Sequence, residues 1–318
     1  MNTISLGGLT VSAQGLGCMG MSEGYGATDW DASIATIRRA LDLGVTLIDT
    51  ADVYGAGHNE VLVGRAIAGR RDEVQLATKV GIDRSVGDTA WVLRGEPAYI
   101  KRACEDSLLR LGVDVIDLYY LHRPPQTASI EDAVGAMAEL VKEGKVRHLG
   151  LSEIDDALLR RAHAIHPIAA VQSEYSVWTR DPETSVLGAL RELGVGLVAF
   201  SPLGRGFLTG TVDVDSLGAK DVRRRLPRFA AEAARANKVI ADTVRAIAEA
   251  NNVTAAQVAL AWVTAQAPRL GVPAVPIPGT KNMRRLEQNA AALDVGLSTD
   301  ELTTLDALAG QVVGARYW

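Results

Sequence analysis

The chain has 318 residues, of which 47% are hydrophobic, and a formal net charge of −5, so we expect residues 1–318 to form one large domain. The acidic balance argues against nucleic-acid binding, and the lack of a long uncharged apolar run argues against a membrane span. The two cysteines, Cys18 and Cys104, have neither zinc nor disulfide-framework spacing, and no signal-like segment is present, so we expect a cytoplasmic protein.

The first predicted element is a hairpin over residues 4–12, where two short β-runs flank Gly7 and Gly8. Eight apolar runs typical of buried strands follow, and amphipathic helical stretches alternate with them. The strands are predicted at residues 12–19, 45–51, 74–80, 115–122, 146–152, 169–175, 195–201 and 274–279. The clearest helical patterns cover residues 31–43, 97–111, 130–142, 230–250 and 254–266, with Thr254 as a plausible N-cap.

Eight alternations of strand and helix favour an α/β fold of the (β/α)8 barrel type, with the hairpin capping its bottom. A doubly wound sheet is the alternative, but the segment after the first strand lacks the glycine spacing of a dinucleotide-binding loop. The longest connection joins the seventh and eighth strands and contains the arginine-rich segment Arg223–Arg228. This segment is either a solvated surface or a lid that closes over a bound cofactor.

Four ionisable side chains lie at or just beyond the carboxyl ends of predicted strands: Asp49, Tyr54, Lys79 and His122. In a parallel barrel these ends share the face that carries the active site, so we expect one polar cluster. Within it, a Lys79 ammonium held by Asp49 would lower the pKa of the Tyr54 hydroxyl. His122 would orient a substrate carbonyl oxygen, to which Tyr54 would donate a proton as a hydride arrives. Each residue alone is more often structural, but the four together favour catalysis.

Aromatic residues are predicted near the same face. Tyr25, Trp30, Trp91 and Trp178 fall in presumptive loops after the first, third and sixth strands, where they would form a partly apolar substrate pocket or simply pack. His163 and His166 are three residues apart, but no third ligand is within reach in the sequence, so no metal site is expected.

Seven motifs occur in order over nearly the whole chain: DTADVYG, ATKVG, LYYLHR, GLS, QSEYS, FSPLGRG and IPGTKNMRRLEQN. Together they resemble the aldo-keto reductase superfamily, in particular bacterial NADPH-dependent reductases related to aryl-alcohol reductases and potassium-channel β subunits. The resemblance implies a (β/α)8 barrel that binds NADPH without a Rossmann fold. It also implies reversible reduction of a small carbonyl substrate, with Asp49, Tyr54, Lys79 and His122 as the catalytic tetrad and Tyr54 as proton donor.

The resemblance also implies a set of cofactor-binding positions. Ser152 and Gln172 match residues that hold the nicotinamide carboxamide, and Phe200 matches an aromatic ring that stacks on the nicotinamide. Where the family often has asparagine after this serine, the chain has Glu153. The remaining positions are Ser201, Leu203 and Arg205 for the pyrophosphate, and Gly279, Thr280, Lys281, Arg285, Gln288 and Asn289 for the adenosine end.

Lys281 and Arg285 lie four residues apart at the start of a predicted helix, where two cations and the helix dipole would attract a 2′-phosphate. This favours NADPH over NADH. The alternative for this pair is a solvated helix face.

Three functions remain open. The first is an NADPH-dependent carbonyl reductase. The second is an NADPH-binding, redox-sensing regulatory subunit with little turnover, as the channel relatives suggest. The third is an aldolase-type barrel with Lys79 as a Schiff-base amine, which leaves Tyr54 and His122 without a role. The physiological substrate and the oligomeric state are not predicted.

Overall fold

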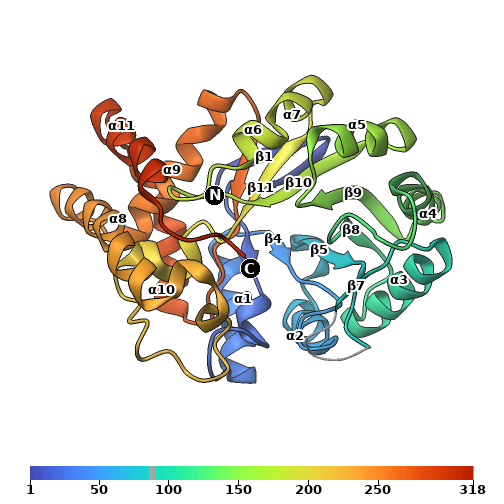
Figure 1. The fold of residues 1–318 in the computed structure, drawn as a ribbon. Helices are drawn as coiled ribbons and strands as arrows, with labels where there is room; N and C mark the ends of the chain where they lie inside the picture. Colours follow the sequence, from blue (N-terminus) through green and yellow to red (C-terminus); the bar gives the residue numbers. More distant parts are fainter. Residues whose placement is uncertain (86–90, 318) are drawn as a thin grey trace.

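A barrel of eight parallel strands forms the centre of the computed structural model, which describes residues 1–85 and 91–317 (Figure 1). The strands, in their order around the sheet, are β3 (Leu16–Gly17), β4 (Leu47–Asp49), β5 (Gln75–Val80), β8 (Ile116–Leu121), β9 (Val146–Ser152), β10 (Ile168–Glu174), β11 (Gly196–Phe200) and β12 (Ala274–Pro276). An isolated parallel bridge between Gly17 and Gly279 joins the two ends of the sheet. All eight predicted strands are confirmed, and the doubly wound alternative is wrong.

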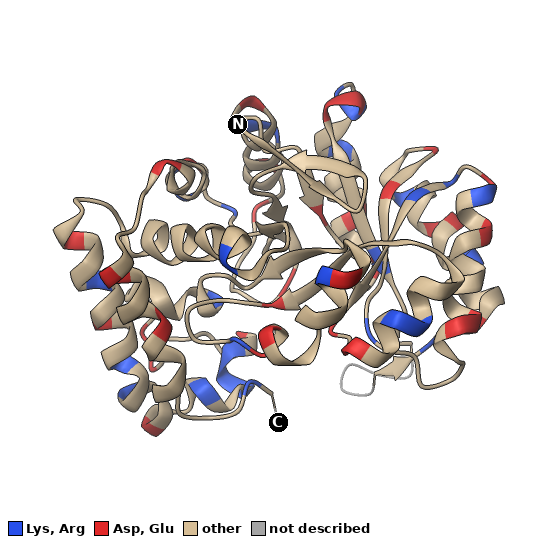
Figure 2. Cartoon of the chain, turned by 90° about the horizontal axis from the view of Figure 1, so that it is seen from above, with Lys and Arg blue, Asp and Glu red and all other residues tan. Residues whose placement is uncertain are grey.

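Helices surround the sheet: α1 (Trp30–Asp42), α2 (His58–Ile67), α3 (Pro97–Leu111), α4 (Ile130–Lys142), α5 (Asp156–Ile165), α6 (Pro182–Ser185), α7 (Leu187–Leu193), α8 (Ala231–Ala250), α9 (Ala255–Leu270), α10 (Met283–Ala290) and α11 (Thr299–Ala307). Thr254 caps α9 as predicted, in a reciprocal capping box with Gln257. Positively and negatively charged residues are interspersed over the outer helices (Figure 2). No helix of the described residues is long and apolar enough to span a membrane.

The predicted N-terminal hairpin consists of β1 (Thr3–Leu6) and β2 (Leu9–Ser12), which pair antiparallel. Leu6, Leu9 and Val11 pack in one apolar cluster with inward-facing strand residues such as Val198. Gly196, at the amino end of β11, makes this packing possible, because a Cβ there would lie only 2.3 Å from Leu6 Cδ2. The hairpin therefore closes the amino-terminal end of the barrel, as predicted, and leaves the opposite end for ligands.

Two features of the carboxyl-end face were not predicted. A small antiparallel pair, β6 (Ile82–Asp83) and β7 (Val92–Leu93), follows β5. The long connection after β11 reaches the loop after β3, where the Val222 N–H donates to Gly24 O at 3.0 Å. The arginine-rich segment thus lies beside the loop that carries Tyr25.

Candidate active site

Lys79 is a fully buried cation at the centre of the carboxyl-end face. Its Nζ donates to Asp49 Oδ1 at 2.5 Å and to Thr50 O at 2.7 Å, and lies 3.3 Å from the Tyr54 hydroxyl. Burial lowers the pKa of Lys79, but the charge of Asp49 and its hydrogen bond raise it above the ordinary value. The ammonium is therefore protonated at neutral pH, and it pairs with the carboxylate that adjoins it on β4.

Asp49 also connects this pair to the opposite part of the barrel. Its Oδ2 accepts a hydrogen bond from Gln172 Nε2 at 2.8 Å, across 123 positions of sequence. A chain of polar contacts therefore runs from β10 through Asp49 and Lys79 to Tyr54. It joins one residue expected at the nicotinamide to three members of the expected tetrad.

Tyr54 lies in the turn between β4 and α2, whose shape depends on left-handed backbone at Gly55, Ala56 and Gly57 (φ 57°, 52° and 89°). Asn59 fixes this turn from below: its Nδ2 donates to Cys18 O at 2.9 Å, and its Oδ1 accepts from the Thr50 hydroxyl at 2.6 Å. Asn59 was not predicted as a site residue, because its only signal was an amide in the first turn of a short helix.

Lys79 lowers the pKa of Tyr54 as predicted, but the predicted net lowering of this pKa is wrong. Burial raises this pKa, and although Lys79 opposes the increase, the net value lies above the ordinary value of 10.0. The charge of Asp49 also raises it, because a carboxylate near the hydroxyl disfavours the phenolate. Tyr54 therefore keeps its proton throughout the neutral range.

His122 lies directly beyond β8 and is 6% exposed. Its ring meets that of Tyr54 edge-on, with the centroids 5.8 Å apart. Burial, followed by the charges of Arg123 and Lys79, depresses its pKa well below the ordinary value, so the ring is neutral. Nδ1 is buried and has no hydrogen-bond partner among the described residues. A buried polar atom of this kind marks a place where a ligand can complete the hydrogen bonding.

Three residues expected at the nicotinamide lie at the carboxyl ends of adjacent strands. Ser152 of β9 pairs in register with Gln172 of β10, and Phe200 ends β11. Ser152 and Gln172 are buried, and the Ser152 hydroxyl accepts a hydrogen bond from Arg123 Nη1 at 3.2 Å. The barrel therefore brings these three side chains to the same side of the tetrad.

The loop after β11 contains a run of left-handed backbone, with φ of 49° at Ser201, 56° at Gly204, 57° at Arg205 and 92° at Gly206. Left-handed backbone of this kind is found at anion sites, and here the Gly204 and Gly206 N–H groups donate within the loop, to Ser201 O and Leu203 O at 2.9 Å each. The Arg205 side chain is already engaged, because Nη2 donates to Glu174 Oε2 at 3.2 Å and to the Tyr317 hydroxyl at 3.0 Å. Leu203, also expected at the pyrophosphate, lies within this loop.

The residues expected at the adenosine end lie where the barrel closes and in the first turns of α10. Asn282 caps this helix by accepting from the Arg285 N–H at 3.1 Å, and the Arg285 side chain is exposed. Lys281 points elsewhere: its Nζ donates to Tyr25 O at 2.9 Å and to Ala27 O at 2.5 Å. Gly279 and Thr280 precede Lys281, and Gln288 and Asn289 lie further along α10.

The structure does not bring the four predicted pocket aromatics together. Trp178 is 2% exposed and stacks on Phe207 with centroids 4.9 Å apart, so it packs beneath the loop and does not line an open pocket. Trp30 begins α1 and meets the His58 ring in a hollow between α1 and α2.

The other two aromatics keep exposed or partly exposed positions. Tyr25 lies against Arg223, whose guanidinium carbon is 5.3 Å from the ring centroid. Trp91 is half-exposed and lies next to Arg84 at the same distance, 5.3 Å. Tyr25 also adjoins a residue of the expected cofactor site, because its carbonyl oxygen accepts from Lys281 Nζ.

The histidine pair near the end of α5 has backbone partners. His163 Nδ1 accepts from the Ile168 N–H at 3.2 Å, and His166 Nδ1 lies 2.9 Å from Pro167 O. Within residues 1–85 and 91–317, no three His, Cys, Asp or Glu side chains lie close enough together to hold a metal ion.

The chain is similar to several known proteins in sequence and in structure. A family model described as "Aldo/keto reductase family" matches residues 14–309. A protein of Glycine max named "Probable aldo-keto reductase 1" is 45% identical over 315 residues, which cover 98% of this chain and 90% of that protein. The glycerol dehydrogenase of Gluconobacter oxydans has a similar structure, with a TM-score of 0.85 and 28% identity over 98% of this chain and 96% of that one. An aldo-keto reductase from Klebsiella pneumoniae, solved with NADPH, has a TM-score of 0.75 and 30% identity over 97% and 96% of the two chains.

Proposed function

Because the chain belongs to the aldo/keto reductase family, we propose that it reduces aldehydes or ketones to alcohols with NADPH, with Tyr54 as the proton donor. Family membership makes the chain an oxidoreductase. The observation that carries the proposal is the Tyr54 hydroxyl, which lies 3.3 Å from the buried Lys79 ammonium and beside the neutral ring of His122. Because the proposed site draws on residues from Tyr25 to Tyr317, we also propose that residues 1–318 act as one domain.

In the proposed mechanism, the substrate carbonyl oxygen lies between the Tyr54 hydroxyl and the His122 ring. NADPH, when bound, supplies the hydride that reaches the carbonyl carbon. As negative charge develops on the oxygen, the hydrogen bonds from Tyr54 and His122 stabilise it, and Tyr54 transfers its proton. Lys79 then stabilises the tyrosinate that remains, and Asp49 holds Lys79 in place.

For the cofactor, we propose that Ser152 and Gln172 hold the carboxamide and that Phe200 stacks on the nicotinamide ring. The left-handed loop of residues 201–206 would lie against the pyrophosphate, where the Gly204 and Gly206 N–H groups and the Arg205 guanidinium already have partners within the protein. Residues 279–289 would receive the adenosine end. Lys281 would have to exchange its contacts with the Tyr25 and Ala27 carbonyls to reach a phosphate. The relative from Klebsiella pneumoniae solved with NADPH supports this choice of cofactor.

The proposal is tested by following NADPH oxidation by the purified protein with a panel of aliphatic and aromatic aldehydes. Turnover with at least one of them is expected. No turnover with any aldehyde, despite NADPH binding, would favour the regulatory subunit with little turnover. The aldolase alternative has no support from the structure, because Lys79 is a paired ammonium and not a free amine.

Arg285→Ala is expected to weaken NADPH binding by about ten- to a hundredfold, while NADH binding changes little. The reason is that a charge-assisted hydrogen bond contributes about 1.5–3 kcal/mol, and only NADPH carries the 2′-phosphate. Dissociation constants for both cofactors, measured by quenching of tryptophan fluorescence, check this. Arg284→Ala is the matched control, since it removes an exposed cation of the same helix one position away. Equal losses for NADPH and NADH would contradict the assignment of Arg285.

Carbonyl reduction is expected to be independent of pH from about 6 to 9, because both titratable groups at the carbonyl keep one protonation state there. Tyr54, whose pKa is raised above 10.0, stays protonated below that value, and His122, whose pKa is well below 6.5, stays neutral above it. The rate should fall only as the pH rises through the Tyr54 pKa, and alcohol oxidation, which needs the deprotonated form, should increase with pH. Profiles of kcat/KM in both directions check this. A midpoint near neutral pH that is absent from the Tyr54→Phe variant would contradict the raised pKa.

A further inference from the structure

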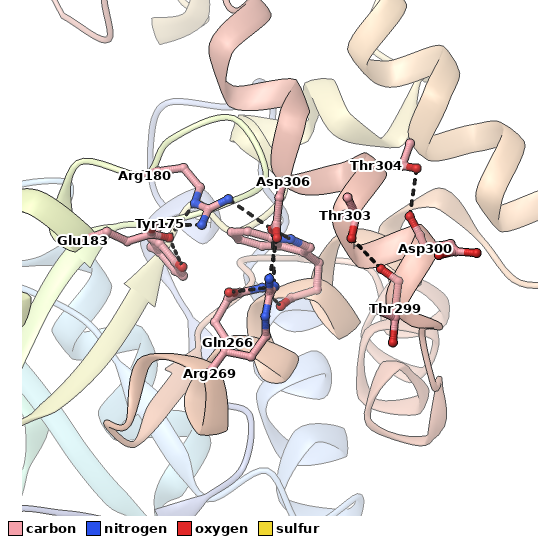
Figure 3. A network of polar contacts seen from close by, with 11 residues as sticks. Tyr175, Arg180, Glu183, Gln266, Arg269, Thr299, Asp300, Thr303, Thr304 and Asp306 are labelled. Carbon is pink, nitrogen blue, oxygen red and sulfur yellow. Dashed lines mark hydrogen bonds and ion pairs between the residues drawn. The ribbon is translucent and has the colours of Figure 1, made fainter.

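The segment Val312–Tyr317, which we call the arm, follows α11 and returns the chain to the carboxyl-end face. Helix α11 is firmly attached before the arm begins (Figure 3). Asp306 accepts hydrogen bonds from Trp262 Nε1 of α9 at 2.9 Å and from Arg180 Nη1, beyond β10, at 3.1 Å. The arm therefore starts from a fixed point.

Contacts with the long connection and with α8 then determine the path of the arm. The buried Asn237 side chain donates to Val313 O at 2.9 Å and accepts from the Val313 N–H at 2.8 Å. Arg228 Nε donates to Gly314 O at 3.3 Å, and Gly314 has a φ of 91°, which a residue with a side chain rarely adopts. The direction in which the arm reaches the site is thus specified by the structure around it.

The arm delivers Arg316 to the proposed nicotinamide end and Tyr317 to the loop proposed for the pyrophosphate. Arg316 forms a two-pronged ion pair with Glu153, which directly follows Ser152, and the Tyr317 hydroxyl accepts from Arg205 at 3.0 Å. Glu153 is itself held, with a φ of 54° and an Oε1 that accepts from the Glu174 N–H at 2.8 Å. At position 153, where the family often has asparagine, this chain therefore has a carboxylate that binds the arm.

Three carboxylate–cation pairs adjoin residues of the proposed cofactor site: Asp49–Lys79, Glu174–Arg205 and Glu153–Arg316. Arg123, which donates to the Ser152 hydroxyl, adds a further cation there. Each pair has no net charge, and only the third takes its cation from the arm. The two side chains of this pair are 13% and 19% exposed, so solvent screens them only partly. The nicotinamide ring is neutral in NADPH and positive in NADP⁺, so an unpaired charge at this place would discriminate between the two forms.

We propose that Arg316 is a counter-ion that belongs to the cofactor site and that, by neutralising Glu153, it sets the relative affinity for NADPH and NADP⁺. The inference rests on the proposed function, because it requires the nicotinamide to bind beside Ser152. It gives the arm a role in tuning cofactor affinity in addition to its packing against α8 and the long connection.

Arg316→Ala leaves the Glu153 carboxylate unpaired, so the ratio of Kd for NADP⁺ to Kd for NADPH should fall by about three- to tenfold. Glu153→Gln keeps the size and the hydrogen-bond acceptor but leaves Arg316 unpaired, so the ratio should rise. The double variant should return toward the wild-type ratio, and Arg316→Lys should keep it. Titration of the purified protein with NADP⁺ and with NADPH, followed by tryptophan fluorescence, measures each ratio without turnover.

Arg161→Ala is the matched control, because it breaks a two-pronged pair with Glu131 between the outer helices α4 and α5. It should leave the ratio unchanged. Equal weakening of both cofactors by Arg316→Ala, or a shift in the opposite direction, would show that the arm is only structural. If Arg316→Ala does not fold, Glu153→Gln alone tests the proposal: a rise in the ratio of Kd for NADP⁺ to Kd for NADPH supports it, and a fall or no change refutes it. A wild-type protein that binds neither cofactor would instead refute the proposed function.

Discussion

Tyr54→Phe is expected to lower kcat for carbonyl reduction by about 10²- to 10⁴-fold, the contribution typical of a positioned general acid. The substitution removes only the hydroxyl that lies 3.3 Å from Lys79 Nζ and leaves the aromatic ring beside His122. NADPH binding should be unchanged, because the residues proposed to hold the cofactor lie on β9–β12 and in the segments that follow them. Steady-state NADPH oxidation with an aldehyde that the wild-type protein reduces, together with a fluorescence titration of NADPH, measures both effects.

Tyr99→Phe is the matched control, since it makes the same chemical change at a partly buried tyrosine of α3 that packs on Arg94. This variant should reduce aldehydes at the wild-type rate. Near-normal turnover by Tyr54→Phe would remove Tyr54 from the role of proton donor, and a parallel loss of NADPH binding would assign it to the cofactor instead.

Lys79→Met is expected to lower the free energy of unfolding by about 3–5 kcal/mol and to abolish most turnover. The loss of stability arises because Asp49, 3% exposed, would keep its charge in the interior with the Lys79 ammonium gone. The loss of activity arises separately, because the ammonium that lies 3.3 Å from the Tyr54 hydroxyl and favours its phenolate would be missing. Urea denaturation of wild type and variant measures the first effect, and NADPH oxidation measures the second.

Adding Asp49→Asn to Lys79→Met separates these two effects. The amide removes the buried charge but can still bond to Gln172, so the double variant should recover much of the stability and none of the activity. A single Lys79→Met variant as stable as the wild type would mean that Asp49 is protonated or solvated once the lysine is absent.

The elements that were predicted well carry their own start and stop signals. The prediction for α3 matches to the residue because Pro97 occupies its first turn and Gly112 ends it in a left-handed conformation with φ of 66°. The strands were visible as apolar runs because both of their faces are buried. Helix α2 was not predicted, since its ten residues lie between glycine-rich turns and contain too few periods of the apolar pattern.

The parts of the site that could not be predicted depend on how deeply a side chain is buried and on the direction in which it points. The sequence places Lys79 and Tyr54 near each other, but it does not show how strongly burial opposes the ammonium, so the sign of the Tyr54 pKa shift was wrong. The same limit explains Trp178, whose ring points into the core beneath its loop. Arg316 was missed because its partner, Glu153, lies 163 positions earlier, and only the departure from asparagine at that position gave a signal.

The bridge between Gly17 and Gly279, which closes the barrel, also lies at the start of a segment proposed to bind the cofactor. A Cβ on Gly17 would lie 3.0 Å from Ile277 O, and one on Gly279 would lie 3.1 Å from Gly17 O, so neither position has room for a side chain without moving the other strand. Gly279 also begins the segment proposed for the adenosine end. A change at this seam would therefore alter how the eight strands meet and where the cofactor segment starts, so these two properties cannot vary independently in this protein.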